Sequence, residues 1–210
     1  MNNKKNFFKN IDDVDLDNIS NSLVSYKPHF QERYEDEIID NIKKKFDIKN
    51  IHNVPKIKKI VISASISNTN VNHTVDLLKK IYNSLYLMSG VKPIYTKAKQ
   101  SISQFKIYKG VITGAKVVLN KHFAYEFLEK LCHAYLPNLK GFKGIPIQSI
   151  SGNTLNIGIN DAHIVNEIVN YLGLLNFSFN ITIVVDRSFD KEVIAYMLKS
   201  FDLPIRDDLR

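Results

Sequence analysis

The sequence predicts an α+β fold, in which helices pack on one side of an antiparallel or mixed sheet. Residues 31–46 repeat an apolar side chain every four positions, which is typical of an amphipathic helix. The segment FNITIVVD instead alternates apolar with polar side chains, which is typical of a strand with one buried face. Helical and strand segments are intermixed along the chain without a regular βαβ repeat, and this favours α+β.

The composition predicts one soluble domain with an appended segment. The chain has 210 residues, of which 44% are hydrophobic, so it is long enough to bury a core. Its single cysteine, Cys132, excludes an internal disulfide and a cysteine zinc cage and favours a reducing compartment. No apolar run approaches the roughly 20 residues of a membrane helix, so no membrane is expected. We expect an N-terminal extension over residues 1–30, partly disordered or bound to a partner, and a single domain over residues 31–210.

The N-terminus and the residue usage favour synthesis inside an organelle. The first 20 residues lack an apolar segment and contain four aspartates, which opposes a cleaved signal or transit peptide. Asparagine, isoleucine and lysine are abundant and there are only four arginines, as expected for an A/T-rich genome. We therefore expect a mitochondrion, with a plastid or a bacterial cytoplasm as alternatives.

The positive charge is concentrated in the middle of the chain. Residues 77–160 carry twelve lysines against two acids, Glu126 and Glu129, and no acid lies between Leu77 and Tyr125. A solvated surface usually mixes both signs. A phosphate backbone explains the excess best, so we expect a nucleic acid as the partner. An anionic membrane surface and simple solubility are the alternatives.

The first half of the chain is predicted to contain two helices and a strand. A helix over residues 31–46 is followed by a strand over KIKKIVISASI and by a helix over residues 72–88, which Gly90 ends. The apolar positions of the first helix are Tyr34, Ile38, Ile42 and Phe46. The expected buried positions of the second are Val75, Leu78, Ile81 or Tyr82, and Leu85.

The second half is predicted to contain most of the strands. Strands over residues 94–98 and 114–119 enclose a lysine-rich segment that loses the alternation. A helix over residues 121–136 follows, with Asn120 as its N-cap and Pro137 beyond its end. Its core face is expected to hold Phe123, Phe127 and Leu131. Strands over residues 147–151 and 154–159 and in FNITIVVD precede a last helix capped by Ser188. The apolar positions of that helix are Phe189, Val193, Met197 and Phe201.

No motif in the sequence predicts catalysis, a metal or a cofactor. Cys132 and His133 are neighbours on a helix, where side chains point about 100° apart, so they cannot form a nucleophile and base pair. The six histidines have no metal-binding spacing, and the aspartates near the N-terminus lack the other residues of a calcium loop. The segment FKIYKG lacks the alternating aromatics of an RNA-recognition motif.

The stretch VKPIYTKAKQSISQFKIYKGVITGAKVVL, residues 91–119, resembles the universal large-subunit ribosomal protein number five. The shared features include Lys92-Pro93, Thr96-Lys97-Ala98, Phe105-Lys106-Ile107 and the pair Gly110 and Gly114. The resemblance extends from about Tyr34 to Arg206 through YEDEII, VPKIKKI, PNLKGFKGIP and FDLPIR. A non-ribosomal RNA-binding module is the alternative.

The resemblance implies an RNA-binding domain of the central protuberance without enzymatic activity or a cofactor. It implies that the segment from Lys97 to Lys109 is a protruding basic loop that reaches the P-site tRNA. Large-subunit rRNA, neighbouring ribosomal proteins and a protein of the small-subunit head are the other implied partners. The expected RNA-binding residues are Lys92, Thr96, Lys97, Lys99, Gln100, Ser101, Lys106, Lys109, Lys116, Lys140 and Lys143.

Three departures from the family concern the surface that binds 5S rRNA. Val91 stands where the family has a glutamine, and Val118 stands where it has a threonine. Residues 63–67, SASIS, stand where the family has an asparagine and a glycine-rich turn. Valine cannot form hydrogen bonds with sugars or bases through its side chain. 5S rRNA is thus a possible partner of this chain, but we expect the contact with it to be altered or lost.

Overall fold

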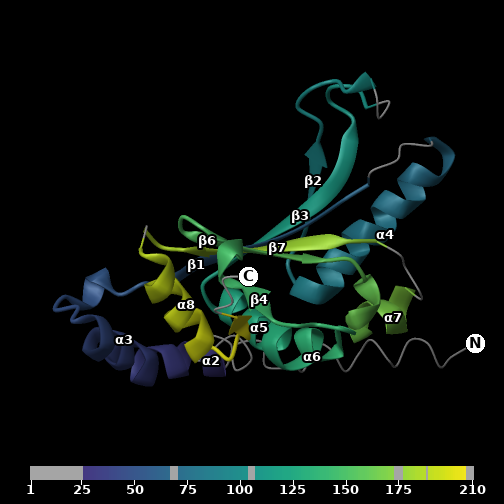
Figure 1. Cartoon of the computed structure of the whole chain (residues 1–210). Coiled ribbons are helices and arrows are strands. Elements are labelled where there is room, and N and C mark those ends of the chain that lie inside the picture. The colour runs from purple at the N-terminus through teal and green to yellow at the C-terminus, as the bar shows by residue number, and fades with distance from the viewer. Residues whose placement is uncertain (1–25, 67–70, 104–106, 173–176, 188, 207–210) are drawn as a thin grey trace, which may run out of the picture.

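A six-stranded antiparallel sheet forms the centre of the molecule. The structure is a computed structural model that describes residues 26–66, 71–103, 107–172, 177–187 and 189–206. The strand order is β2-β3-β1-β7-β6-β5, and every pair of neighbours is antiparallel. In Figure 1 most of the helices lie beneath the sheet, α4 slopes upward beside β3, and the β2–β3 edge of the sheet extends upward beyond the other strands. The predicted α+β fold, with helices on one side of the sheet and a protruding loop, is confirmed.

The strands of the sheet differ in length. Their bounds are β1 Ile57–Ser65, β2 Ile94–Lys97, β3 Ile112–Asn120, β5 Ile150–Ser151, β6 Thr154–Ile159 and β7 Phe179–Val185. Two further strands, β4 Ile145–Pro146 and β8 Ile205–Arg206, form a separate parallel pair. Because β2 is an edge strand, one of its sides has no partner strand in the sheet.

The helices come from both ends and the middle of the chain. Their bounds are α2 His29–Arg33, α3 Ile39–Phe46, α4 Val71–Ser89, α5 His122–Lys130, α6 Leu136–Asn138, α7 Asn166–Leu172 and α8 Lys191–Ser200. One π-helical turn, Tyr34–Ile38, joins α2 to α3, and another, Leu131–Tyr135, joins α5 to α6. Single 3₁₀ turns within the described residues include Ile51–Asn53, Ile147–Ser149 and Ala162–Ile164.

Alternation along the strands separates a covered face from an open one. On β1, Ile60 and Ile62 are buried against the helices, whereas Val61 between them is only half-buried on the other side. The aromatic rings of Phe30 and Tyr34 pack on Phe201 in the helix layer, with centroids 5.6 and 6.0 Å from it. The core therefore lies between the sheet and the helices, and the side of the sheet opposite α5 and α8 carries no described helix.

Several predicted details are wrong. Val75 is 55% exposed and Phe123 is 39% exposed, so neither belongs to the core face predicted for its helix. Asn120 is the last residue of β3, and the N-cap of α5 is Lys121, which has a φ of 52° and no capping hydrogen bond from its side chain. Pro137 lies inside α6 rather than beyond the helix end.

Two other predicted elements differ in part from the structure. Of the strand expected over residues 147–151, only Ile150–Ser151 is a strand, β5, because Ile147–Ser149 form a 3₁₀ turn. Ser188, the predicted N-cap of the last helix, lies outside the described residues. Among the helices in the described part of the chain, none is long and apolar enough to span a membrane.

Candidate RNA-binding surface

The open face of the sheet is polar and carries no acid among its strand residues. We define it by the outward side chains of the strands, which pair across the sheet in rows. One row runs Lys116, Ser63 and Asn180, and the next runs Val118, Val61, Thr182 and Asn156. The hydroxyl of Thr182 donates a hydrogen bond to Asn156 Oδ1 at 2.8 Å. Uncharged hydrogen-bonding groups with a few lysines suit a phosphate and sugar backbone better than an acidic partner.

Two lysines stand on this open face and an ion pair lies at its border. Lys116 on β3 is exposed, and Lys59 on β1 is half-buried. Asp186, just beyond the end of β7, lies 4.0 Å from each of the ammonium groups of Lys56 and Lys58. The acid is thus compensated by two bases, and the face keeps its positive character.

The protruding segment between β2 and β3 is held by backbone hydrogen bonds. We call residues 98–111 the basic loop. At its base, Ala98 N–H donates to Val111 O at 2.9 Å and Gly110 N–H donates to Ala98 O at 3.0 Å. Further out, Ile102 and Ile107 exchange hydrogen bonds of 2.8 and 3.1 Å. The loop therefore continues the hairpin away from the sheet, as Figure 1 shows.

The lysines of this hairpin are free to meet a phosphate backbone. Lys97, Lys99 and Lys109 are exposed, and none forms an ion pair with another described residue. Gly110 turns the chain with a φ of 88°, a value that favours glycine. Tyr108 is 71% exposed beside these lysines. The hairpin thus carries bare positive charges and an exposed ring at some distance from the core.

Two family models match the chain. One, described as "Ribosomal protein L5", covers residues 50–107, and the other, described as the C-terminus of the same ribosomal family, covers residues 112–205. The chain belongs to the ribosomal protein L5 family. Among its relatives, "Large ribosomal subunit protein uL5" of Borreliella burgdorferi (strain ZS7) is 40% identical over 183 residues, which are 86% of this chain and 98% of that protein. The same protein of Borreliella afzelii (strain PKo) and of Borrelia garinii subsp. bavariensis (strain ATCC BAA-2496 / DSM 23469 / PBi) is 39% identical over the same shares.

Membership of the L5 family establishes the general function. The protein is a structural, non-enzymatic constituent of the large ribosomal subunit that binds rRNA and neighbouring ribosomal proteins. The alternative of a non-ribosomal RNA-binding module has no support among these relatives. They are bacterial proteins, so they fit the alternative of a bacterial cytoplasm and give no support to the mitochondrial assignment.

The structure brings most of the expected RNA-binding residues into one region of this L5-family protein. Thr96 lies opposite Gly114 on the open face of β2, and Lys116 lies on β3 beside it. The Ser101 hydroxyl accepts a hydrogen bond from Lys109 N–H at 3.0 Å, so it shapes the basic loop. The exposed members of this group are Lys92 in the turn before β2, Lys97, Lys99, Gln100, Ser101, Lys109 and Lys116. Lys106 lies outside the described residues.

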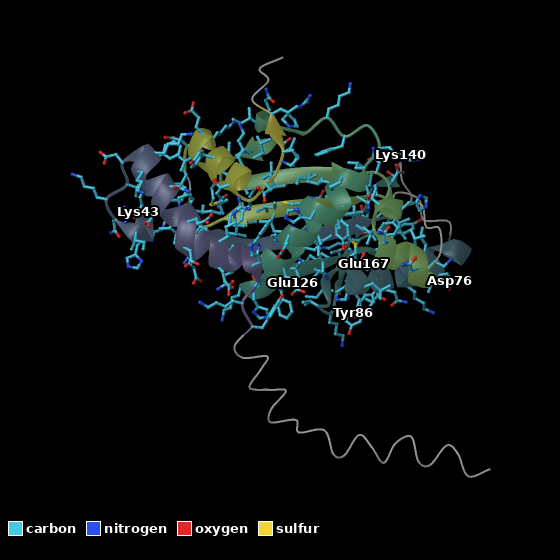
Figure 2. All side chains as sticks on the ribbon, turned by 90° about the horizontal axis from the view of Figure 1, so that it is seen from below. Lys43, Asp76, Tyr86, Glu126, Lys140 and Glu167 are labelled. Atoms are coloured by element: carbon cyan, nitrogen blue, oxygen red, sulfur yellow. The ribbon has the colours of Figure 1, made fainter. Side chains whose placement is uncertain are left out.

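Two expected residues lie elsewhere. Lys140 and Lys143 belong to the exposed loop between α6 and β4. Seen from the helix side in Figure 2, Lys140 and Tyr86 of α4 lie at opposite rims of the molecule. Lys140 lines a cavity of about 490 Å³ together with Asp161 and His163. In Figure 1, α6 and β4 lie beneath the sheet, whereas the β2–β3 hairpin rises above it, so any RNA that these lysines contact is on a different side of the protein from the basic loop.

Sequence reasoning missed Lys59 and Tyr108. In IKKIVISAS the side chains of Lys59 and Ile60 are expected to point to opposite faces of β1, so the pattern could have predicted that this lysine lies on the open face. For Tyr108 the sequence carries no such signal, because its exposure depends on how far the hairpin extends beyond the body.

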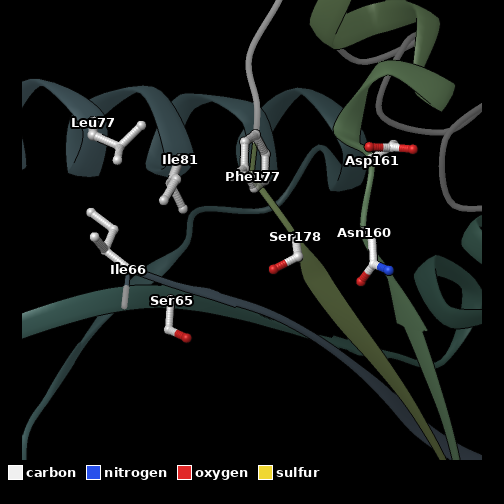
Figure 3. A pocket seen from close by; sticks show the side chains of 8 residues that line it. All are labelled: Ser65, Ile66, Leu77, Ile81, Asn160, Asp161, Phe177 and Ser178. Carbon is white, nitrogen blue, oxygen red and sulfur yellow. The ribbon is translucent and has the colours of Figure 1, made fainter. Parts of the chain in front are cut away.

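A cavity at the end of β1 offers no catalytic pair. Figure 3 shows this space of about 480 Å³ between α4 and the ends of β1, β6 and β7. Ile66, Ile81 and Phe177 form part of its apolar side, and Ser178 and Asp161 part of its polar side. Asp161 is the one ionisable side chain among the described lining residues, so the cavity has no acid and base pair.

The chemistry of Cys132 is that of a structural side chain. Its Sγ–H donates a hydrogen bond to Phe201 O at 3.3 Å, and burial raises the pKa of the thiol to about 12. A thiol with such a pKa is not a nucleophile at neutral pH. Among the described residues, no group of three His, Cys, Asp or Glu side chains could hold a metal ion.

Proposed function

We propose that this L5-family protein lies in the central protuberance, where the open face of its sheet binds rRNA and its basic loop contacts the P-site tRNA. The observation that carries the proposal is the pairing of an acid-free polar face with a hairpin of unpaired lysines beside it. Strands β2 and β3 belong to the open face and also carry the basic loop, so RNA bound to the sheet would fix the direction in which the loop points. The loop would then reach a second RNA from a fixed base.

The proposed tRNA contact follows from the kind of groups in the loop. Lysine side chains bind phosphates without reading bases, which suits a contact that every tRNA must be able to make. The backbone hydrogen bonds between Ile102 and Ile107 keep the two arms of the loop together. Lysines on both arms of the hairpin would then follow a backbone over several nucleotides.

Assembled ribosomes provide the test of the tRNA contact. We expect the quadruple alanine variant of Lys97, Lys99, Lys106 and Lys109 to lower P-site tRNA retention, because each lost phosphate contact reduces the number of counterions released on binding. The effect should shrink at high salt. A matched control replaces Lys44 and Lys49, exposed residues at the far end of the helix layer, by alanine. Unchanged retention in the quadruple variant, with normal incorporation into subunits, would rule out the contact.

We propose that the contact with 5S rRNA is altered at one position of the open face. Val118 lies opposite Val61, and the two form the apolar end of the row that continues with Thr182 and Asn156. Val91 is half-buried in the turn before β2 and packs against the core, and its N–H donates to Ser89 Oγ at 3.2 Å. Val118 is therefore the replacement that removes a hydrogen-bonding side chain from the open face.

Restoring the hydroxyl tests this proposal. We expect Val118→Thr to raise the affinity of the protein for 5S rRNA about five-fold, the value of one net hydrogen bond of about 1 kcal/mol. Val91→Gln serves as the comparison and should change the affinity less. Crosslinking in cells adds a second readout. Recovery of as much 5S-like RNA with the native protein as with Val118→Thr would refute the proposed loss of this contact.

The remaining expectations concern partners and compartment. A contact with a protein of the small-subunit head stays a proposal that rests on the family resemblance. The extension proposed for residues 1–30 lies almost wholly outside the described residues, whereas Phe30 itself is fully buried in the core. We propose a protein partner for the extension, because its balanced charge argues against an RNA-binding tail. Immunogold labelling of cells would decide between an organelle and a bacterial cytoplasm.

A further inference from the structure

A stacked pair of tyrosines lies on the helix side of β2, and a third tyrosine follows one helical turn along α4. The rings of Tyr82 on α4 and Tyr95 on β2 stack with centroids 4.9 Å apart and an interplanar angle of 27°. Tyr86 follows Tyr82 by one helical turn, so it lies on the same side of α4. We call these three residues the tyrosine platform. None of them belongs to the open face or to the basic loop.

The outer rings of the platform are exposed. Tyr86 is 51% exposed and Tyr95 is 40% exposed, Tyr82 is half-buried, and Tyr34, Tyr125 and Tyr135 are buried in the helix layer. The exposed ring of Tyr95, which stacks on Tyr82, can accept a further flat ring. The pair is also held in place by two different elements, so little ordering would be needed when a ring binds.

The charges around the platform favour an RNA ligand. Lys79 precedes Tyr82 by three residues on α4, and Lys97 follows Tyr95 by two residues on β2, which are the spacings of side chains on the same side. Both lysines are exposed and form no ion pair with another described residue. The stretch from Leu77 to Tyr125, which contains the whole platform, has no acid.

We propose that the tyrosine platform stacks an unpaired RNA base, with Lys79 and Lys97 on the neighbouring phosphates. Aromatic side chains beside lysines are the usual means of holding single-stranded RNA without a strong sequence preference. The proposal rests on the ribosomal function, but it concerns the opposite side of β2 from the open face. A single short strand would thus contact RNA on both of its sides, with a loop or bulge of the RNA on the platform.

Binding of a short single strand by the full-length protein tests the platform. The probe is an RNA of about eight nucleotides with a fluorescent end label, compared with the same sequence in a duplex. We expect Tyr86→Leu and Tyr95→Leu each to weaken binding of the single strand about 5-fold to 100-fold, the usual effect of removing a base-stacking ring. Tyr86→Phe keeps the ring and should bind within about two-fold of the unchanged protein. Tyr26→Leu, at another exposed tyrosine, is the matched control.

Crosslinking in assembled large subunits gives a second readout. Short-wave ultraviolet light should join a platform tyrosine to an unpaired rRNA nucleotide, and the crosslink should be lost in Tyr86→Leu. Equal binding by Tyr86→Leu and the unchanged protein, or a crosslink to a protein in place of RNA, would overturn the proposal. Failure of the platform alone would leave the loss of rRNA binding in open-face lysine variants intact, so it is distinguishable from failure of the proposed function.

Discussion

The two faces of the sheet are made by the same strands and differ in almost every side chain. The covered face carries isoleucine, valine, leucine and phenylalanine, which are buried against the helices. The open face carries mainly serine, threonine, asparagine and lysine, together with Ile94, Val61, Val118 and Val184, and these side chains remain at least partly exposed. Successive residues of one strand point to opposite faces, so one strand supplies both sets. Residues that stabilise the core and residues proposed to bind RNA are therefore adjacent along each strand.

This separation means that neighbouring substitutions should have different consequences. A change on the covered face removes buried apolar surface and lowers the free energy of unfolding. A change on the open face alters what the protein can bind and leaves the core untouched. The largest effects on stability are therefore expected from the covered face, and the smallest from the open one.

Ile62→Ala and Val61→Ala compare adjacent residues of β1. Ile62 is fully buried, so its truncation should lower the free energy of unfolding by about 2–5 kcal/mol. Val61 is half-buried on the open face, and its truncation should cost less than about 1 kcal/mol. Urea unfolding followed by circular dichroism measures both. Similar losses for the two variants would mean that the open face is packed against something in the free protein.

Gly114→Ala tests the close approach of β3 to β1. A Cβ at Gly114 would overlap the backbone oxygen of Ala64, and a backbone cannot move aside as a flexible side chain can. We expect a loss of about 1–3 kcal/mol, as for an overpacked site. Gly158→Ala on β6 is the matched control, since its Cβ would lie 3.4 Å from Asn180 Oδ1, an ordinary contact. Thermal unfolding measures both variants. The same unfolding midpoint for Gly114→Ala and Gly158→Ala would contradict a tight pairing of β1 with β3.

Alkaline pH should destabilise the helix layer, because its buried tyrosines resist ionisation in the folded state. Burial raises the pKa of Tyr34 to about 12, and it also raises the pKa values of Tyr125 and Tyr135. Burial raises the pKa of Cys132 in the same way. The folded state binds these protons more tightly than the unfolded state. Their contribution is therefore present below the unfolded pKa values and is lost as the pH rises toward the folded ones.

The loss should begin above pH 9, the ordinary value for the thiol, and above pH 10 for the phenols. Each group should then cost up to about 1.4 kcal/mol per pH unit. Absorbance at long ultraviolet wavelength reports tyrosine ionisation, and circular dichroism reports unfolding. The buried tyrosines should ionise together with unfolding. Ionisation of all tyrosines as a single ordinary population in the folded state would show that the helix layer is open to water.

Lys59→Ala and Lys116→Ala should reduce RNA binding without affecting stability. Each lost phosphate contact should lower the slope of log affinity against log salt by about 0.9, and the free energy of unfolding should change by less than about 0.5 kcal/mol. Titration of an rRNA fragment at several salt concentrations measures the slope. An unchanged slope would mean that the two lysines are solvated in the complex.

Local pattern was enough to predict the fold, and tertiary context decided the rest. The alternation in FNITIVVD predicts β7 at its observed residues, and the four-residue repeat predicts that Ile38 and Ile42 are buried. The same reasoning fails for Val75 and Phe123, which have the helical spacing of core residues but lie near the N-terminal ends of α4 and α5 and are exposed. Periodicity describes a face of one helix and does not say how far its neighbour reaches.

The candidate site was predictable where it follows the chain and unpredictable where it depends on folding. Lys97, Lys99 and Lys109 lie in one hairpin, so the sequence groups them as the structure does. Lys140 and Lys143 come from a second basic loop, and only the topology separates them from the first. The tyrosine platform joins β2 to the helix that precedes it, a pairing that no local pattern records.

Incorporation into large ribosomal subunits tests the division of the sheet most directly. The double variant Lys59→Glu with Lys116→Glu reverses charge on the open face, and Lys44→Glu with Lys49→Glu reverses the same charge at the far end of the helix layer. Tagged proteins would be followed by sedimentation of native extracts, with circular dichroism to confirm folding. The open-face variant should be folded but largely absent from large subunits, whereas the control variant should sediment with them. Equal incorporation of both variants would contradict it.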